Sequence, residues 1–169
     1  VSDAESAYLQ AWLGSKVPVW VELPQEYWLP EWEGKYHRPM CQLMLALYGH
    51  EDSGGYWEEK SYGEVMACGW TRVEGRRGVF AMIVNGVVLG MLMIYVDDFK
   101  MAGPVESIDK AFMDIRKRID MDDPVELDGA KCLGCTHLVR NQVRKGVQVQ
   151  DMENDMCDAM AGCVESFKR

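Results

Sequence analysis

The chain has 169 residues, and 48% of them are hydrophobic, which is enough to build the core of one globular domain of ordinary size. Its formal net charge of -9 argues against a surface that binds nucleic acid throughout, because phosphate contacts need lysine and arginine. Between Gly129 and Gln150, however, there is no Asp or Glu, so we expect any polyanion to bind there.

The first third of the chain carries signals for two helices and a strand. The spacing of apolar residues predicts a short helix from Asp3 to Leu13, with Ser2 or Asp3 as the N-cap. Alternation predicts an edge strand over Val17–Leu23, which a loop rich in Trp, Tyr and Pro follows. Residues 40–48 fit a helix or a strand equally well, and a second helix is predicted from about Tyr56 to Cys68.

The most informative stretch begins at Val79 and carries no charge as far as Val96. It is long enough to suggest a membrane span, but Asn85-Gly86 predicts a type I′ turn and therefore a hairpin, so no membrane partner is expected. The second strand runs directly into Asp97-Asp98. Adjacent carboxylates in apolar surroundings are costly unless a divalent cation such as Mg²⁺ binds them. A solvent-exposed acidic turn is the alternative interpretation.

The remainder of the chain predicts one more helix, two strands and a final helix. Apolar residues at three- and four-residue spacing mark an amphipathic helix over Val105–Ile119. Strands are predicted over Lys131–Val139 and Val143–Val149, and a helix over Asp151–Phe167. This order of elements indicates an α+β fold.

The cysteines and the start of the chain bear on its compartment. The chain begins at Val1 without a basic and then apolar leader, so we expect an intracellular piece of a longer protein with reduced cysteines. Cys132, Cys135 and His137 have zinc-site spacing. On one continuous strand, however, Cys132 and Cys135 would face opposite sides, which argues against a zinc site.

Several segments together resemble a known family. Tyr95-Val96-Asp97-Asp98, after an apolar strand, resembles the catalytic signature of reverse transcriptases. Other segments are similar to the Ty1/copia type of retrotransposon polymerase, in collinear order from Asp3 to about His137. They are Asp3–Gln10, Val17–Pro24, Ala46–Gly49 with Tyr56-Trp57, and Leu133–Cys135.

The resemblance implies the palm of a right-hand polymerase, an antiparallel sheet backed by helices. The backing helices would be those predicted at Ala4–Leu13 or Tyr56–Cys68, and at Val105–Ile119. The whole chain, 1–169, would be a single fragment of the domain, with fingers and palm over about 1–139 and the start of the thumb over about 140–169. The implied activity is RNA-directed DNA polymerisation. Asp3, Asp97 and Asp98 would hold two Mg²⁺ ions, for which Mn²⁺ could substitute.

Further roles follow from the same resemblance. Tyr8 would exclude a 2′-hydroxyl from the nucleotide site, and Tyr95 would also contact the nucleotide. Leu133 and Gly134 would lie at the primer grip, with phosphate contacts from Lys131, Arg140, Arg144 and Lys145. The implied partners are an RNA or DNA template with its primer, deoxynucleoside triphosphates and the remainder of a polyprotein, in the cytoplasm, the nucleus or a retrotransposon particle.

Two departures from the family lead to an alternative. Asp52-Ser53-Gly54-Gly55 stands where the family has Gln-Ala-Pro-Arg, and a carboxylate beside a triphosphate is unfavourable. Asp3 lies two residues from the start of the chain, so the strand that should hold it is expected to be nearly absent and to fray. We therefore expect the parent protein to polymerise and this piece alone not to. The alternative is a non-catalytic retroelement remnant that acts as a folded interaction domain.

Overall fold

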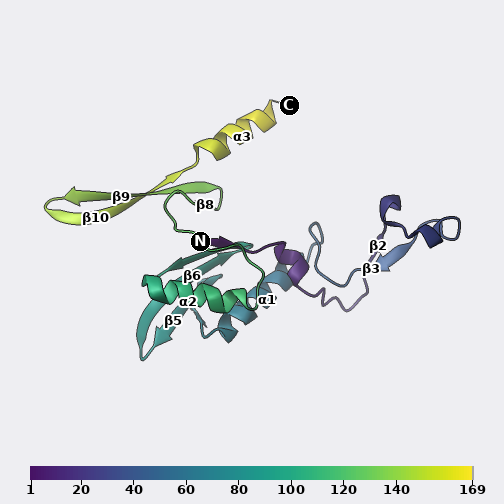
Figure 1. Cartoon of the computed structure of the whole chain (residues 1–169), viewed down its shortest axis with the longest axis horizontal. Coiled ribbons are helices and arrows are strands. Elements are labelled where there is room, and N and C mark those ends of the chain that lie inside the picture. The colour runs from purple at the N-terminus through teal and green to yellow at the C-terminus, as the bar shows by residue number, and fades with distance from the viewer. Residues whose placement is uncertain (169) are drawn as a thin grey trace. The chain divides into compact units, whose positions relative to one another are not determined.

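The computed structural model describes residues 1–168 and divides the chain into two compact units. The sheet unit comprises Val1–Glu5 and the chain from Tyr62 onward, and the arm unit comprises Ser6–Ser61. Figure 1 labels the α-helices and most of the strands of both units.

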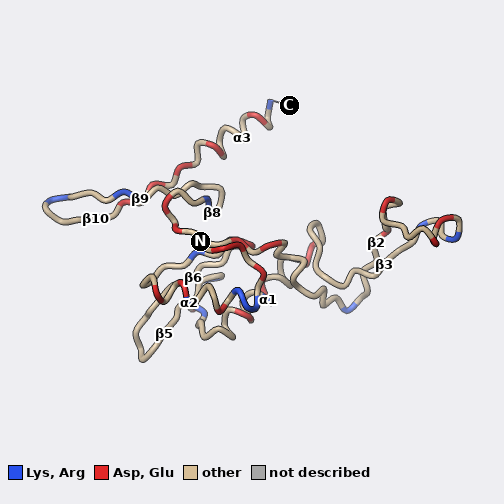
Figure 2. The backbone as a smooth tube through the Cα atoms, viewed as in Figure 1, with Lys and Arg blue, Asp and Glu red and all other residues tan. Residues whose placement is uncertain are grey.

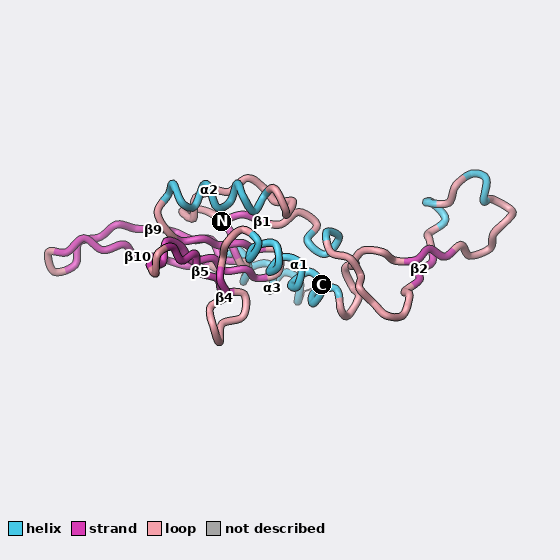
Figure 3. Tube along the Cα trace, turned by 90° about the horizontal axis from the view of Figure 1, so that it is seen from below, coloured by secondary structure: helices cyan, strands magenta, loops and turns pink. Residues whose placement is uncertain are grey.

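The sheet unit is built on a five-stranded antiparallel sheet in the order β1-β7-β6-β5-β4. Helix α2 (Val105–Arg116) lies along this sheet (Figures 1 and 3). Its residues Phe112 and Ile115 are buried. The strands are β1 (Ser2–Asp3), β4 (Thr71–Arg72), β5 (Val79–Val84), β6 (Val87–Tyr95) and β7 (Asp98–Ala102).

The uncharged stretch forms the predicted hairpin. Asn85 and Gly86 have φ of 51° and 78°, as a type I′ turn requires, so this prediction is confirmed. Phe80, Leu92 and Phe99, from three neighbouring strands, are fully buried. No helix within residues 1–168 combines the length and the apolar character needed to cross a membrane.

The predicted helix from Asp3 to Leu13 is wrong. Ser2 and Asp3 form β1, and the only helical segment nearby is the 3₁₀ helix η1 (Ala7–Gln10). Ser2 pairs with Phe99 and Asp3 pairs with Asp98 of β7. These long-range backbone hydrogen bonds outweigh the helical spacing of the side chains, because local helix propensity is weak. Of the helices proposed to back the sheet, α2 lies along it, whereas Ala4–Leu13 does not form the predicted helix.

A second, three-stranded antiparallel sheet follows α2. Its strands are β8 (Lys131–Cys132), β9 (Cys135–Arg144) and β10 (Val147–Asp155), and the helix α3 (Cys157–Phe167) comes next. The predicted bounds were wrong here because two tight turns were missed: Leu133-Gly134 and Lys145-Gly146 all have φ between 53° and 80°. The helix predicted from Asp151 begins only at Cys157, since 151–155 pairs with β9.

The arm unit contains little regular structure. β2 (Trp20–Glu22) lies within the predicted edge strand and pairs with β3 (Met40–Gln42), which resolves the first part of 40–48 as a strand. Between them lie two short 3₁₀ helices, η2 (Gln25–Tyr27) and η3 (Pro30–Trp32). The predicted second helix is confirmed as α1 (Ser53–Ala67), which begins three residues before the predicted start. The last residues of α1 belong to the sheet unit. There the Tyr62 ring packs edge-on against Phe80, with 5.0 Å between the ring centroids.

Candidate functional site

Two of the predicted acidic residues share one row of the five-stranded sheet. Asp3 on β1 lies opposite Asp98 on β7, which in turn lies opposite Tyr95 on β6. The next row consists of Ser2, Phe99 and Ile94, and all three are buried. Because successive side chains of a strand point to opposite faces, Asp3, Asp98 and Tyr95 project from the other face, as neighbours about 5 Å apart at Cβ.

Asp97 joins this row through the turn between β6 and β7. Val96 has a φ of 56°, which lets the chain reverse within two residues. The Ala4 N–H donates to the Asp97 carbonyl oxygen at 2.8 Å, so Asp97 lies beside the residue that follows Asp3. Residues almost one hundred positions apart in the chain thus meet at one edge of the sheet. We call Asp3, Asp97 and Asp98 the acidic row; Figure 2 draws acidic positions in red.

The N-terminal strand is held on both sides, so the expectation that Asp3 lies on a fraying end is wrong. On the side away from β7, the Val1 ammonium group donates to the Val125 carbonyl at 2.7 Å, and the Val125 N–H donates back to Val1 at 2.8 Å. Ser2 Oγ donates to the Asp122 carbonyl at 2.8 Å, and the Asp122 N–H donates to the Asp3 carbonyl at 2.9 Å. The segment that follows α2 therefore anchors Asp3.

The carboxylates of the acidic row repel one another. Partial burial raises the pKa of Asp3 first, and the negative charges of Asp97, Asp98 and Asp122 raise it further. Asp122 was not predicted as part of the site, although it belongs to the acid-rich run Asp120–Asp123. A bound divalent cation would relieve this repulsion, and carboxylate oxygens are ligands of the kind that Mg²⁺ prefers.

The acidic row is not a preformed metal cage. Within residues 1–168, no three or more His, Cys, Asp and Glu side chains are arranged so that they could hold one metal ion. The three carboxylates have the oxygen ligands that Mg²⁺ prefers and share one sheet edge, but they do not converge on one point. Their side chains would have to turn toward a common point to bind it.

The turn between β8 and β9 contacts the acidic row directly. The Leu133 N–H donates to Asp98 Oδ2 at 3.2 Å. Burial raises the pKa of the Cys132 thiol, and the Asp98 carboxylate lies close enough to raise it further. Leu133 lines an open surface cleft of about 460 Å³ together with Tyr95, Val96, Asp97 and Asp98. The structure thus brings predicted Leu133, and Gly134 after it, to the acidic row. Cys132 was not predicted there.

The argument that excluded a zinc site at the cysteines is wrong. A turn, not a continuous strand, separates Cys132 from Cys135, and the two residues are strand partners that share one face. His137 projects from the same face, two residues along β9. Its Nδ1 lies 2.7 Å from Asn154 Oδ1, and its buried Nε2 has no hydrogen-bond partner among residues 1–168. The three side chains nevertheless do not form a metal-holding group within those residues.

The predicted phosphate-binding arginines are already paired with acids. Arg140 lies 2.7 Å from Glu153, and Arg144 lies 2.6 Å from Asp151, in each case between β9 and β10. The stretch from Gly129 to Gln150 contains no acid, but acids on β10 neutralise its two arginines in the folded chain. Figure 2 shows blue and red segments on this hairpin.

The two lysines differ from each other. Lys131 Nζ lies 3.6 Å from Asp158 at the start of α3. Lys145 lies in the β9–β10 turn and takes part in none of the ion pairs that the structure describes within 1–168. Of the four predicted basic residues, Lys145 is therefore the one whose charge is least compensated.

Tyr8 belongs to the arm unit, so its role opposite the acidic row remains a prediction. There its ring lies 4.7 Å from that of Tyr48, at an interplanar angle of 30°. Ser53, in the segment that departs from the family pattern, is fully buried, and its Oγ both donates to the Leu47 carbonyl and accepts from the Leu47 N–H. The departing segment thus begins α1 and fastens Ala46–Gly49 to it.

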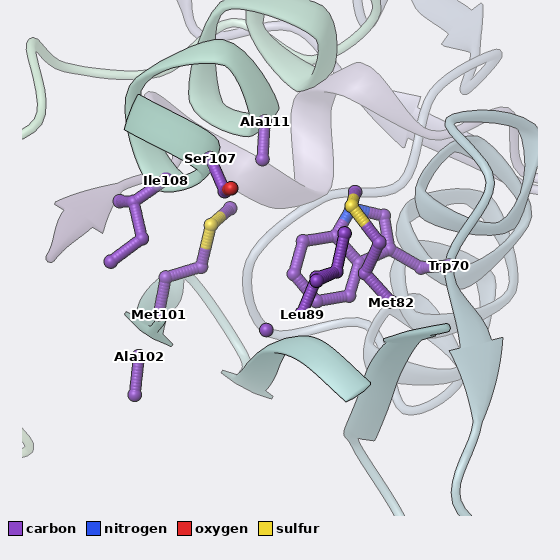
Figure 4. Close-up of a pocket in the computed structure, with 9 residues that line it drawn as sticks. Trp70, Met82, Leu89, Met101, Ala102, Ser107, Ile108 and Ala111 are labelled. Atoms are coloured by element: carbon purple, nitrogen blue, oxygen red, sulfur yellow. The ribbon is translucent and has the colours of Figure 1, made fainter. Parts of the chain in front are cut away.

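A second hollow lies between α2 and the five-stranded sheet, and it is apolar. Figure 4 shows the side chains of Trp70, Met82 and Leu89 gathered there, with Ser107 and Ala111 projecting from α2. Its volume is about 10 Å³, and the Trp70 Nε1 has no hydrogen-bond partner within residues 1–168. It contains no carboxylate and is lined by none of the predicted site residues.

The chain was compared with models of known protein families, with curated proteins and with solved structures, and none of them matches.

Proposed function

We propose that this chain is the palm region of an RNA-directed DNA polymerase of the Ty1/copia retrotransposon type. The observation that carries the proposal is the pairing of Asp3 with Asp98 across two antiparallel strands, with Asp97 in the adjoining turn. Two-metal nucleotidyl transfer needs carboxylates from separate elements that can converge on the ions, and the pairing brings Asp3 and Asp98 from two strands to one sheet edge. The collinear motifs that resemble the family support the same assignment.

In this proposal Asp3, Asp97 and Asp98 would hold the two Mg²⁺ ions. Bound Mg²⁺ would neutralise the triphosphate and make the primer 3′-hydroxyl more acidic. The Leu133 N–H, which donates to Asp98 Oδ2 at 3.2 Å, would help to orient this carboxylate. Tyr95 projects from the same face and offers a ring beside the nucleotide. The Leu133-Gly134 turn would lie against the primer end.

The alternative is a non-catalytic retroelement remnant that serves as a folded interaction domain. Two observations favour it: residues 1–168 hold no preformed metal cage, and Arg140 and Arg144 are neutralised by acids of β10. An active polymerase would have to rotate its carboxylates on metal binding and exchange these ion pairs for phosphates. Exposed ion pairs are weak enough for the second change to cost little.

Mn²⁺ binding to the purified chain tests the proposal at its first step. Electron paramagnetic resonance counts free Mn²⁺ during a titration, and we expect Asp3→Asn, Asp97→Asn and Asp98→Asn each to weaken binding at least about tenfold, since each removes a charged ligand. Asp109→Asn is the matched control, because Asp109 is exposed on α2 and lies outside the acidic row. Equal binding by all four variants would contradict the proposal.

Primer extension tests the second step. An RNA template with a DNA primer and deoxynucleoside triphosphates is offered, with Mg²⁺ or Mn²⁺, to the 169-residue chain and to a chain extended at its N-terminus by the parent sequence. Incorporation that Asp98→Asn abolishes supports the polymerase. Metal binding without incorporation by either chain would favour the remnant.

A further inference from the structure

Two cysteines lie directly opposite each other at the turn that contacts Asp98. We propose that Cys132 and Cys135 are a redox-active dithiol that closes reversibly to a disulfide, with a low-molecular-weight disulfide such as oxidised glutathione as the oxidant. This inference is independent of the polymerase proposal, because it concerns the chemistry of the two thiols alone.

The register of the hairpin places the two thiols within reach of each other. Cys132 on β8 is the strand partner of Cys135 on β9, and the two-residue turn Leu133-Gly134 joins them. Directly opposite residues of an antiparallel pair have Cα atoms about 4.5–5.5 Å apart, which falls within the range of about 4.4–6.8 Å found in disulfides. Their Cβ atoms, at about 4.5–5.5 Å, are slightly farther apart than the usual disulfide spacing, so closure must draw the strands together. Strained disulfides are the ones that are readily reduced again.

The pair is distinguished from the other cysteines by this register. All six cysteines are unbridged in the structure. Within residues 1–168, no other cysteine has a cysteine as its strand partner: Cys41 pairs with Val21, and the remaining three lie outside the paired strands. The remaining three are Cys68, Cys157 and Cys163.

The two thiols differ in accessibility, which sets the order of reaction. Cys132 is only 2% exposed, whereas Cys135 is partly exposed. Cys135 is therefore the thiol that a soluble oxidant reaches first, and Cys132 is the one that completes the reaction.

The reaction is two successive thiol–disulfide exchanges. The Cys135 thiolate attacks one sulfur of the small disulfide; a bond forms between the two sulfurs, the small disulfide breaks, and one small thiolate leaves and takes up a proton. The Cys132 thiol loses its proton and attacks Cys135 Sγ, which forms the Cys132–Cys135 bond and releases the second small thiol. Two cysteine thiols are oxidised, and one small disulfide is reduced to two thiols.

Closure would change the surroundings of Asp98. Leu133, whose N–H donates to Asp98 Oδ2, lies in the two-residue turn that the disulfide would cross-link, so drawing the strands together would shift this donor. If the proposed function holds, the oxidation state of this pair would therefore adjust one carboxylate of the acidic row.

Mass spectrometry of one peptide tests the proposal. Trypsin cleaves after Lys131 and after Arg140, so both cysteines fall in the single peptide Cys132–Arg140. The purified full chain is equilibrated with oxidised and reduced glutathione at several ratios, quenched in acid, alkylated with N-ethylmaleimide and digested. We expect this peptide to lose two hydrogens and both alkyl groups as the oxidised fraction rises, and to regain both alkyl groups after dithiothreitol. Neither metal nor nucleic acid is present, so failure of the polymerase proposal would not affect the result.

Two variants and one assay complete the test. Cys163→Ser, on exposed α3, should leave formation of the disulfide unchanged. Cys135→Ser should leave Cys132 alkylated when the ratio of oxidised to reduced glutathione is low. The proposal is overturned if the wild-type peptide carries two alkyl groups or two glutathiones at every ratio. It is equally overturned if elemental analysis finds one zinc ion per chain that protects both thiols from alkylation.

Discussion

The acidic row and the β9–β10 hairpin differ in how their charged side chains are arranged: the row places like charges together, and the hairpin pairs opposite charges. In the acidic row, like charges from two strands and a turn lie side by side, and burial together with repulsion raises the pKa of Asp3. On the hairpin, each arginine of β9 lies against an acid of β10, and all of these side chains are at least partly exposed. Both regions are antiparallel strands, so strand structure does not account for the difference.

The comparison shows where a ligand would gain binding energy. A cation at the acidic row would relieve repulsion that is already present in the fold. An anion at the hairpin would first have to displace Glu153 from Arg140 or Asp151 from Arg144. Uncompensated charge, not the local count of charged residues, therefore makes the acidic row the more favourable of the two regions for a ligand of opposite charge.

The largest expected effect tests whether the five-stranded sheet, which carries the acidic row, is more tightly packed around its backbone than the β9–β10 hairpin. Gly78 has a φ of +71°, and a Cβ there would collide with the Ile94 carbonyl oxygen of β6. We expect Gly78→Ala to lower the free energy of unfolding by at least about 3 kcal/mol, because backbone cannot move aside as a side chain can. Urea denaturation measures the change.

The matched control for this variant lies in the hairpin. Gly146 has a φ of +80°, but a Cβ there would meet nothing within 4 Å. Gly146→Ala should therefore cost only the conformational strain of about 1 kcal/mol. Equal losses for the two variants would mean that the sheet contact between Gly78 and Ile94 is not the cause.

A smaller effect, of opposite sign in the two regions, comes from replacing one aspartate by asparagine. Asp3→Asn removes a repelled charge, so at pH 7 and without metal it should raise the free energy of unfolding by up to about 1 kcal/mol. Asp151→Asn removes the partner of Arg144 and should lower it by a similar or smaller amount. Thermal unfolding in a metal-free buffer measures both. If both variants are destabilised, the repulsion in the acidic row is negligible.

The pH dependence of the wild-type chain sharpens the same point. The pKa of Asp3 is raised in the folded state, so the ionised Asp3 carboxylate destabilises the fold. This destabilisation is fully present above the raised pKa and is relieved as the pH falls through it. The advantage of Asp3→Asn over the wild type should therefore shrink as the pH is lowered toward and below that pKa. An advantage that stays constant from pH 7 to pH 3 would contradict this assignment.

The smallest effect concerns binding of a polyanion to the hairpin. Lys145→Gln should weaken binding of a single-stranded oligonucleotide more than Arg144→Gln does, because Arg144 must first leave Asp151. Each phosphate contact that is lost should reduce the slope of log affinity against log salt by about 0.7. Fluorescence anisotropy at several salt concentrations measures this slope. Equal losses for the two variants would show that the Arg144–Asp151 pair does not compete with phosphate.

Features that depend on neighbours along the chain were predictable from the sequence. Asn85-Gly86 specified its hairpin because both residues readily adopt positive φ, and the apolar spacing of Val105–Ile119 specified α2. The placement of Asp97-Asp98 where β6 ends also followed from the sequence, although β6 is buried only at Leu92 and Ile94 and Asp98 is already the first residue of β7.

Features that depend on distant partners were decided only by the tertiary structure. Asp3 became a strand residue because β7 and the segment at Asp122 supply hydrogen bonds that local propensity cannot anticipate. The turn at Leu133-Gly134, which makes Cys132 and Cys135 strand partners, depends on the pairing of β8 with β9, whereas the local sequence favours one continuous strand. The acids that neutralise Arg140 and Arg144 come from the following strand, beyond the stretch that lacks acids. In each case the deciding energy comes from contacts between segments that the sequence order does not reveal, because register and pairing are fixed only when the strands meet.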